Sequence, residues 1–169
     1  MRRSAAAGAV LRGIRRPQPP PKHYSQPESR DIRTAGNAVP YKNILVLDVD
    51  NVKRSVSYID VGDDTSLPPL VIIPGTAQTA ATFSPHYRQI AKTRRLIIPE
   101  IRSQGRTELL SEYCTIDQHV DDFYRIIVDH LGINQVHLAG FSFGGRVSLA
   151  IAAHYPQHVS FIFGNVWGS

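Results

Sequence analysis

Hydrophobic residues gather in short runs from Lys42 onward, separated by polar intervals that are rich in turn-forming residues. The first two runs, at residues 44–47 and 52–61, contain β-branched and aromatic side chains on either side of a turn-rich interval, which favours an antiparallel hairpin. The next run, residues 70–73, is continuous and ends on a Pro-Gly pair, as expected of a strand that is buried on both faces. The pattern therefore predicts the start of a sheet.

Helical and extended spacing then alternate along the chain. Apolar residues recur at helical spacing from Phe83 to Ala91 and again, at intervals of three and four, from Val120 to Leu131. Asp117 is predicted to cap this second helix, and Gly132 follows it as a stop signal. The other predicted elements are strands at 96–98, 136–139 and 161–163 and a helix at 144–155. Strands that alternate with helices of about 10 to 15 residues imply an α/β fold, with a mostly parallel sheet and helices on both faces.

The N-terminus has a different composition. Residues 1–27 contain no acidic side chain and carry five arginines, and prolines between residues 17 and 30 exclude a regular helix or sheet interior. We therefore expect residues 1–37 to be a disordered basic, Pro-rich extension and residues 38–169 to form one domain. The acid-free, Arg-rich composition resembles a mitochondrial transit peptide; a basic end without a targeting role is the alternative.

The net charge of +5 arises in this extension. Residues 1–30 hold seven Lys or Arg and one acid, which leaves twelve Lys or Arg against thirteen acids in residues 31–169. A nucleic-acid interface requires positive charge on a folded face, so we expect no nucleic-acid partner. No apolar stretch approaches the roughly 20 residues that span a bilayer, and we expect no transmembrane segment.

Cys114 is the only cysteine, which excludes an intrachain disulfide and a Cys-based zinc cluster. No histidine or lysine stands beside Cys114 to activate its thiol, so we interpret this residue as a bystander. We expect neither a metal ion nor a cofactor.

The candidate chemistry lies between the strand predicted at 136–139 and the helix predicted at 144–155. Residues 140–144, Gly-Phe-Ser-Phe-Gly, match the G-x-S-x-G nucleophile elbow, in which the serine takes a strained backbone conformation at a sharp strand-to-helix turn. Glycines two positions away prevent collisions, and the helix N-terminus presents backbone N–H donors beneath the serine. The bare motif is common by chance, but its position between a strand and a helix makes Ser142 a candidate nucleophile.

On these residues, the sequence from 42 to 168 resembles the N-terminal part of the α/β-hydrolase fold, in its serine-nucleophile branch. The segments that carry the resemblance are 58–62, 70–76, 100–107, 132–145 and 153–159. Residues 100–107 are similar to the D-x-R-G-x-G-x-S loop of that family. The resemblance implies a fold that is truncated after its sixth strand. The serine at the elbow argues against the epoxide-hydrolase and dehalogenase branches of the family.

The resemblance also implies an oxyanion hole. Family members use the backbone N–H of the residue after the nucleophile and one from the loop after the third strand, which here are Phe143 and Thr76. A proline, Pro74, replaces the usual histidine of this loop. A similar loop is a feature of the maspardin-like branch, so a noncatalytic binding or scaffold protein of the same fold is the alternative function.

The rest of a catalytic triad does not follow Ser142. In this family the acid and then the histidine come after the serine, but residues 143–169 contain no Asp or Glu. His154 lies about 18 Å along the predicted helix at 1.5 Å per residue, and we interpret His137 and His158 as structural. We therefore expect the domain to be incomplete at its C-terminus and the 169-residue chain to be inactive.

The function expected of the full-length protein is hydrolysis of an ester-like or related bond in a small-molecule substrate. Aromatic residues near the motif, Phe141, Phe143 and Trp167, favour an apolar acyl or ester group, although such residues are more often part of the core. The sixth strand, near residues 159–166, carries apolar side chains without charge or proline. An uncovered edge of this composition favours oligomerisation through strand pairing.

Overall fold

The computed structural model describes residues 40–48, 50–64, 66–83, 89–108 and 114–165, so the predicted N-terminal extension and Trp167 lie outside the described residues. The strands are β1 (Tyr41–Leu47), β2 (Lys53–Val61), β3 (Leu70–Ile73), β4 (Leu96–Pro99), β5 (Val136–Phe141) and β6 (Val159–Asn165). The helical elements are η1 (Ala80–Phe83), α2 (Ile116–Phe123), η3 (Tyr124–His130), α3 (Phe143–His154) and η4 (Pro156–His158).

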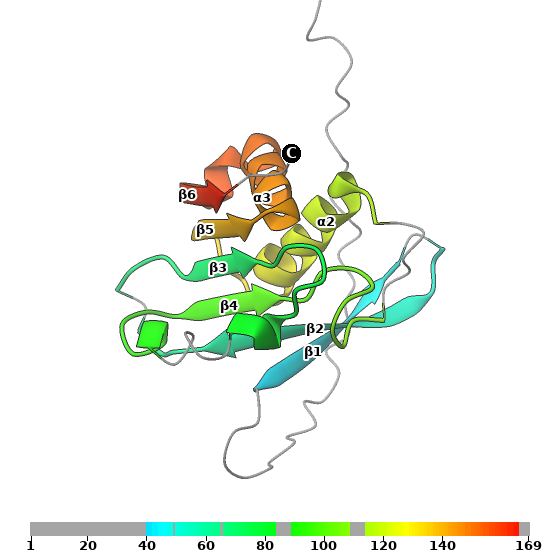
Figure 1. Ribbon diagram of the computed structural model, residues 1–169, viewed down its shortest axis with the longest axis horizontal. Helices are drawn as coiled ribbons and strands as arrows, with labels where there is room; N and C mark the ends of the chain where they lie inside the picture. Colours follow the sequence, from blue (N-terminus) through cyan, green and yellow to red (C-terminus); the bar gives the residue numbers. More distant parts are fainter. Residues whose placement is uncertain (1–39, 49, 65, 84–88, 109–113, 166–169) are drawn as a thin grey trace, which may run out of the picture.

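The strands form one sheet in the order β1-β2-β4-β3-β5-β6 (Figure 1). The predicted hairpin is confirmed, because β1 pairs antiparallel with β2, which pairs antiparallel with β4. The remaining pairs, β4 with β3, β3 with β5 and β5 with β6, are parallel. The carboxyl ends of β4, β3 and β5 consequently lie side by side, and the loops that follow these strands meet at one edge of the sheet.

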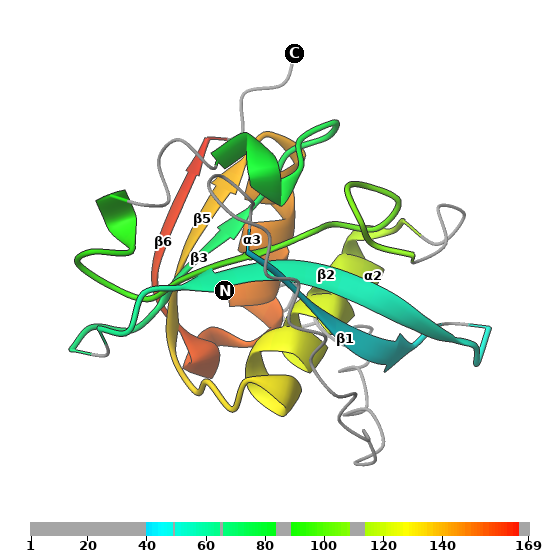
Figure 2. The ribbon, with the colours of Figure 1, turned by 90° about the horizontal axis from the view of Figure 1, so that it is seen from below.

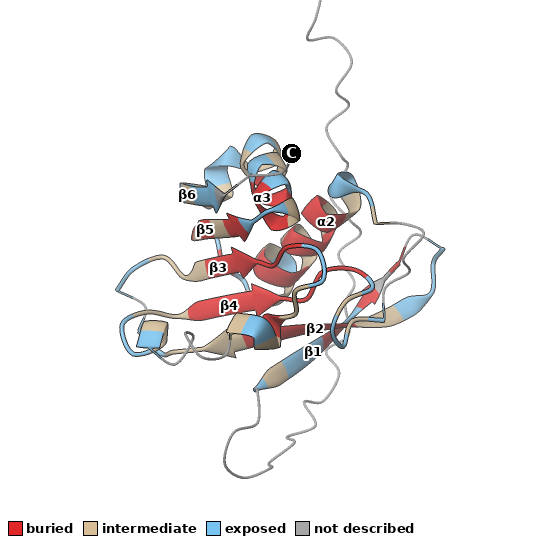
Figure 3. Cartoon of the chain, viewed as in Figure 1, coloured by how far each residue is buried: buried red, intermediate tan, exposed pale blue. Residues whose placement is uncertain are grey.

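Helices α2 and α3 lie on the same face of the sheet (Figure 2). Their apolar residues, including Phe123 and Val147, join alternate strand residues such as Val71 and Leu138 in the larger core cluster. The opposite face holds a smaller cluster around Ile72, Leu96 and Ile98, and Ala80 of η1 covers part of it. The predicted helix at 83–91 includes residues outside the described part, so it stays a prediction. Figure 3 shows that burial is greatest in the central strands.

The start of α2 differs from the prediction. Thr115, not Asp117, is the N-cap, and its hydroxyl accepts a hydrogen bond from the Gln118 N–H at 3.2 Å. A hydroxyl at the cap satisfies a donor that the helix leaves without a partner, whereas Asp117 lies in the first turn and favours the helix through its charge. The predicted end is confirmed, because Gly132 follows η3 with φ +66°.

The predicted apolar edge is present in β6. Phe161 and Phe163 are 58% and 61% exposed, and among the described strands β6 pairs only with β5. Ile162 points the other way and packs against the larger core cluster. Oligomerisation through this edge stays a prediction. No helix within the described part of the chain is long and apolar enough to cross a membrane.

Candidate functional site

Ser142 occupies the turn between β5 and α3 in a backbone conformation that side chains rarely adopt. Its φ is 50° and its ψ is −115°, and it is exposed at the N-cap of α3. A residue in such a strained region persists only where the surrounding structure enforces it. The Ser142 hydroxyl makes no capping hydrogen bond to the helix, so this turn presents it at the surface.

Two glycines of the motif allow this turn. A Cβ added to Gly140 would lie 2.5 Å from Ser148 Oγ, and one added to Gly144 would lie 2.8 Å from the carbonyl carbon of Ile73. Real Cβ atoms do not approach other atoms so closely. The glycines are therefore required because α3 begins directly above the ends of β3 and β5.

The loop after β3 lies against this turn. A Cβ added to Gly75 would lie 3.5 Å from the Cβ of Ser142. The Gly75 N–H donates to Gln78 Oε1 at 2.8 Å, the Gln78 N–H donates to the Gly75 carbonyl at 3.1 Å, and Ala77 has φ 61°. These contacts form a tight turn of the class that needs positive φ at its third position. Thr76 is the second residue of this turn, directly after Gly75.

The backbone N–H groups of Thr76 and Phe143 are unused within the described residues. Thr76 is exposed, and no hydrogen bond from its N–H occurs in that part of the chain. Phe143 is the first residue of α3, where N–H groups have no acceptor inside the helix. The loop that contains Thr76 thus lies against the turn of Ser142 and Phe143, and neither N–H group has an acceptor in the described part of the chain.

We interpreted three histidines as structural. Each of them has a polar contact that its ring nitrogen makes with another group. His137 Nδ1 lies 2.9 Å from Arg94 Nη2, His154 Nδ1 lies 2.8 Å from the Ala150 carbonyl oxygen, and His158 Nδ1 lies 2.7 Å from the Asn134 carbonyl oxygen. These contacts account for the histidines without a role at Ser142.

The sequence analysis missed His119 of α2, a buried histidine next to the candidate site. It is 5% exposed, its Nδ1 lies 2.6 Å from the Thr115 carbonyl oxygen, and its ring meets the Phe143 ring edge-on with centroids 5.1 Å apart. Burial lowers the pKa of His119; the hydrogen bond to the Thr115 carbonyl opposes this shift, and the charge of Arg102 adds to it, so the environment favours the neutral ring. The Thr115 carbonyl accepts from Nδ1–H, which leaves the buried Nε2 without a partner among the described residues.

We predict that protonation of His119 destabilises the chain. Because its folded pKa is lower than the unfolded value, its stabilising contribution is complete above about pH 6.5 and is lost as the pH falls through the folded pKa. The His119→Leu variant should therefore lose less stability than the wild type between pH 7.5 and pH 5.5. Urea denaturation at both pH values measures this, and equal losses in the two proteins would contradict it.

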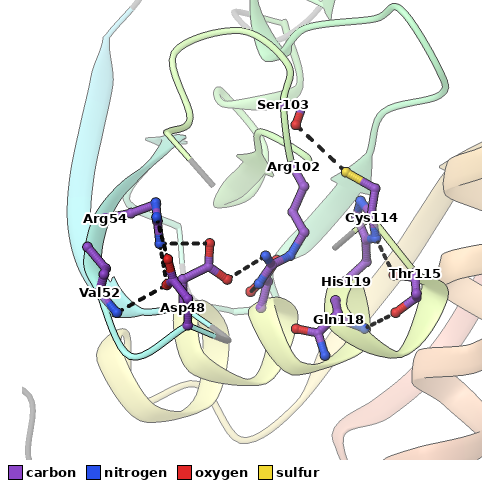
Figure 4. A network of polar contacts seen from close by, with 11 residues as sticks. Asp48, Val52, Arg54, Arg102, Ser103, Cys114, Thr115, Gln118 and His119 are labelled. Carbon is purple, nitrogen blue, oxygen red and sulfur yellow. Dashed lines mark hydrogen bonds and ion pairs between the residues drawn. The ribbon is translucent and has the colours of Figure 1, made fainter. Parts of the chain in front are cut away.

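A buried arginine connects the loop after β4 to two other elements (Figure 4). Arg102 is 1% exposed; its Nε and Nη2 donate to the two carboxylate oxygens of Asp122 in α2 at 2.7 and 2.8 Å. Its Nη1 donates to Asp48 Oδ1 at the end of β1, at 2.7 Å. Burial raises the pKa of Asp122 to about 6, and the Arg102 charge opposes this shift. The arginine thereby ties the hairpin, the loop and α2 together.

No group of three or more His, Cys, Asp or Glu residues in the described ranges could hold a metal ion. Cys114 lies at the start of α2, with its Sγ 3.8 Å from Ser103 Oγ.

The fold and this turn are those of a known class. Residues 68–163 match the model of the alpha/beta hydrolase fold family, and the chain belongs to that family. The chain is 29% identical to human maspardin over 128 residues, which cover 75% of this chain and 37% of that protein. It is 32% identical to 2-hydroxymuconate semialdehyde hydrolase of Pseudomonas sp. (strain CF600) over 96 residues, which cover 54% of this chain and 33% of the relative.

A solved structure shows the same fold at lower identity. A probable hydrolytic enzyme from Pseudomonas aeruginosa PAO1 superposes with a TM-score of 0.69 at 18% identity, over 76% of this chain and 42% of that chain. The chain thus spans well under half the length of each of these proteins.

Proposed function

We propose that this chain contributes the nucleophile and the oxyanion hole of a serine hydrolase. Ser142 attacks the carbonyl carbon of the substrate, and the negative charge that develops on the carbonyl oxygen is stabilised by the N–H groups of Phe143 and Thr76. The observation that carries the proposal is the strained, exposed Ser142 together with the unused N–H groups of Phe143 and of the loop that lies against its turn. The similarity to a hydrolase of semialdehyde substrates supports the same reading.

The reaction needs a base to accept the proton of the Ser142 hydroxyl, because serine is a weak nucleophile when it is protonated. Residues 143–169 contain no Asp or Glu, so the acid of a family-type triad is not in that segment. In the hydrolase that we propose, the acid and the histidine that activate Ser142 therefore come from outside residues 143–169. Attack gives a tetrahedral intermediate, and its collapse breaks the bond to the leaving alcohol or thiol, which takes up the proton that the base accepted from Ser142. Water then hydrolyses the acyl-enzyme, which releases the acid and restores the Ser142 hydroxyl.

The substrate that we propose is a small ester, thioester or related carbonyl compound with an apolar group. Phe141, the residue before Ser142, is 36% exposed and packs against Phe83, with ring centroids 5.3 Å apart. Phe143, which we also considered for the pocket, instead packs against the core and His119. This leaves Phe141 as the aromatic residue that supports an apolar substrate.

A fluorophosphonate probe tests the function on the complete gene product. We expect covalent labelling of the wild type and a loss of about a hundredfold or more in Ser142→Ala, because the probe reacts with an activated serine. Ser103→Ala, which removes an exposed serine hydroxyl of the loop after β4, should label like the wild type. Absence of labelling in folded protein would contradict the proposal that the protein is a serine hydrolase.

That negative outcome would favour a noncatalytic binding or scaffold protein. Two observations support this alternative: Pro74 replaces the histidine that is usual in the oxyanion loop, and the chain is similar to maspardin over 75% of its length. The labelling experiment separates the two functions, because a scaffold does not need an activated Ser142.

A further inference from the structure

Glu100 and Tyr41 form a buried pair at the same edge of the sheet as Ser142. Glu100 directly follows β4 and is 3% exposed, and the Tyr41 hydroxyl donates to its Oε1 at 2.5 Å. So short a distance is typical of a hydroxyl that donates to a charged carboxylate. Glu100, Gly75 and Ser142 follow β4, β3 and β5, three neighbouring parallel strands, so the pair lies at the end of the strand beside the oxyanion loop.

The pair is connected to η1, the short helix that follows this loop. The Ala81 N–H donates to the Tyr41 hydroxyl at 3.2 Å, and the neighbouring Ala80 is completely buried. At the other end of η1, the Phe83 ring packs against Phe141, the residue before Ser142. One end of η1 is thus held by Tyr41 and the other by the turn that carries Ser142.

The Glu100 carboxyl is fixed in place at an energetic cost. Its Oε2 is buried and has no hydrogen-bond partner among the described residues, and Gly105, with φ +60°, lies directly against the carboxyl group. Burial raises the pKa of Glu100, and burial followed by the Glu100 contact raises the pKa of Tyr41 to about 12.

We propose that Glu100 and Tyr41 are positioning residues that hold the oxyanion loop against Ser142. Glu100 orients the Tyr41 hydroxyl, the hydroxyl binds the backbone of η1, and η1 fixes the loop in which Thr76 lies. The inference rests on the proposed function for its catalytic consequence, but the position of the loop can be measured without any activity.

The test compares Glu100→Gln and Tyr41→Phe with a matched control, Tyr58→Phe. The Tyr58 hydroxyl lies in the same hairpin and is also hydrogen-bonded, to His130 Nε2 at 3.0 Å, but its ring belongs to the cluster on the opposite face. Tyr41→Phe removes two hydrogen bonds of the hydroxyl, the one to Glu100 and the one from the Ala81 N–H, whereas Tyr58→Phe removes one, so urea denaturation measures the stability loss of each variant. Exchange at the loop that is faster than this stability loss accounts for reports on the loop and not on general stability.

Hydrogen exchange of a peptide that covers residues 76–83 is the first readout. We expect faster exchange there in Glu100→Gln and Tyr41→Phe, and wild-type exchange in Tyr58→Phe. Wild-type exchange of this peptide in both site variants would overturn the proposal, whether or not Ser142 labels.

Fluorophosphonate labelling of the complete gene product is the second readout. Loss of an oxyanion donor costs roughly a hundred- to a thousandfold, and displacement of the loop should cost less, so we expect about a tenfold slower maximal labelling rate with little change in probe affinity. Faster exchange with an unchanged labelling rate would overturn the catalytic consequence. If the wild type does not label, the proposed function fails, while the exchange result still decides whether the pair holds the loop.

Discussion

Replacement of Arg102 by methionine should lower the free energy of unfolding by about 3–5 kcal/mol. The substitution leaves the carboxylates of Asp48 and Asp122 without the guanidinium that pairs with both of them inside the protein. The Arg102 side chain and that of Asp48 are both 0% exposed, so water cannot replace the lost hydrogen bonds. Urea denaturation measures the loss, which is a large part of the 5–15 kcal/mol typical of a whole domain.

Arg54→Met is the matched control. Arg54 also contacts Asp48, at 3.5 Å, but its stronger partner is Asp50 near the surface, at 2.6 Å. Exposed ion pairs of this kind contribute about 0–1 kcal/mol, so the control should lose much less stability. If both variants lost the same free energy of unfolding, burial of the Arg102 ion pairs would not be the reason for their contribution to stability.

The period of the hydrophobic residues was sufficient to predict most of the elements. Strands of continuous apolar residues, such as Leu70–Ile73, and the helix after Ser142 lie close to where the pattern placed them. The order of the strands in the sheet does not follow from this pattern, because a hydrophobic period says which residues are buried and not which strands are neighbours. The cap of α2 was assigned to the wrong residue, since Thr115 and Asp117 are both capping residue types and the hydrogen bond decides between them.

The residues of the candidate site also fall into two groups, those that the sequence predicts and those that it does not. Ser142 and Phe143 follow from a local motif, and Thr76 follows from its matching position after the third strand. The groups around them were not predictable, because their contacts join distant parts of the chain: Glu100 meets Tyr41 across 59 positions, and Arg102 meets Asp48 across 54. His119 was missed because the family order places the triad histidine after the serine, and the contact of its ring with Phe143 exists only once α2 packs on α3.

These supporting groups converge on the ends of three parallel strands. Arg102 and Glu100 fix the loop after β4, Gln78 fixes the loop after β3, and the motif glycines fix the turn after β5. Binding sites of open α/β sheets lie at this edge because only there do loops from several strands face one another. The position of Ser142 is therefore set by the sheet, and local changes at the strand ends should affect both stability and reactivity.

Gly144→Ala is expected to produce the largest effect of this kind, a stability loss of about 3 kcal/mol or more. The added Cβ would meet the backbone carbonyl groups of Ile73 and Pro74, and backbone atoms in the middle of a sheet cannot move aside as a flexible side chain can. The start of α3 would have to lift from β3, which would release Ser142 from its strained conformation. Fluorophosphonate labelling of the complete gene product should therefore fall together with the stability measured in urea.

Gly164→Ala provides the comparison, because the same methyl group added there meets nothing closer than 3.8 Å. This control should unfold within about 0.5 kcal/mol of the wild type, as surface substitutions away from special features usually do. If Gly144→Ala were as stable as Gly164→Ala, the close approach of α3 to β3 would not be what holds the turn. Ser142 would then owe its backbone conformation to contacts other than the approach of α3 to β3.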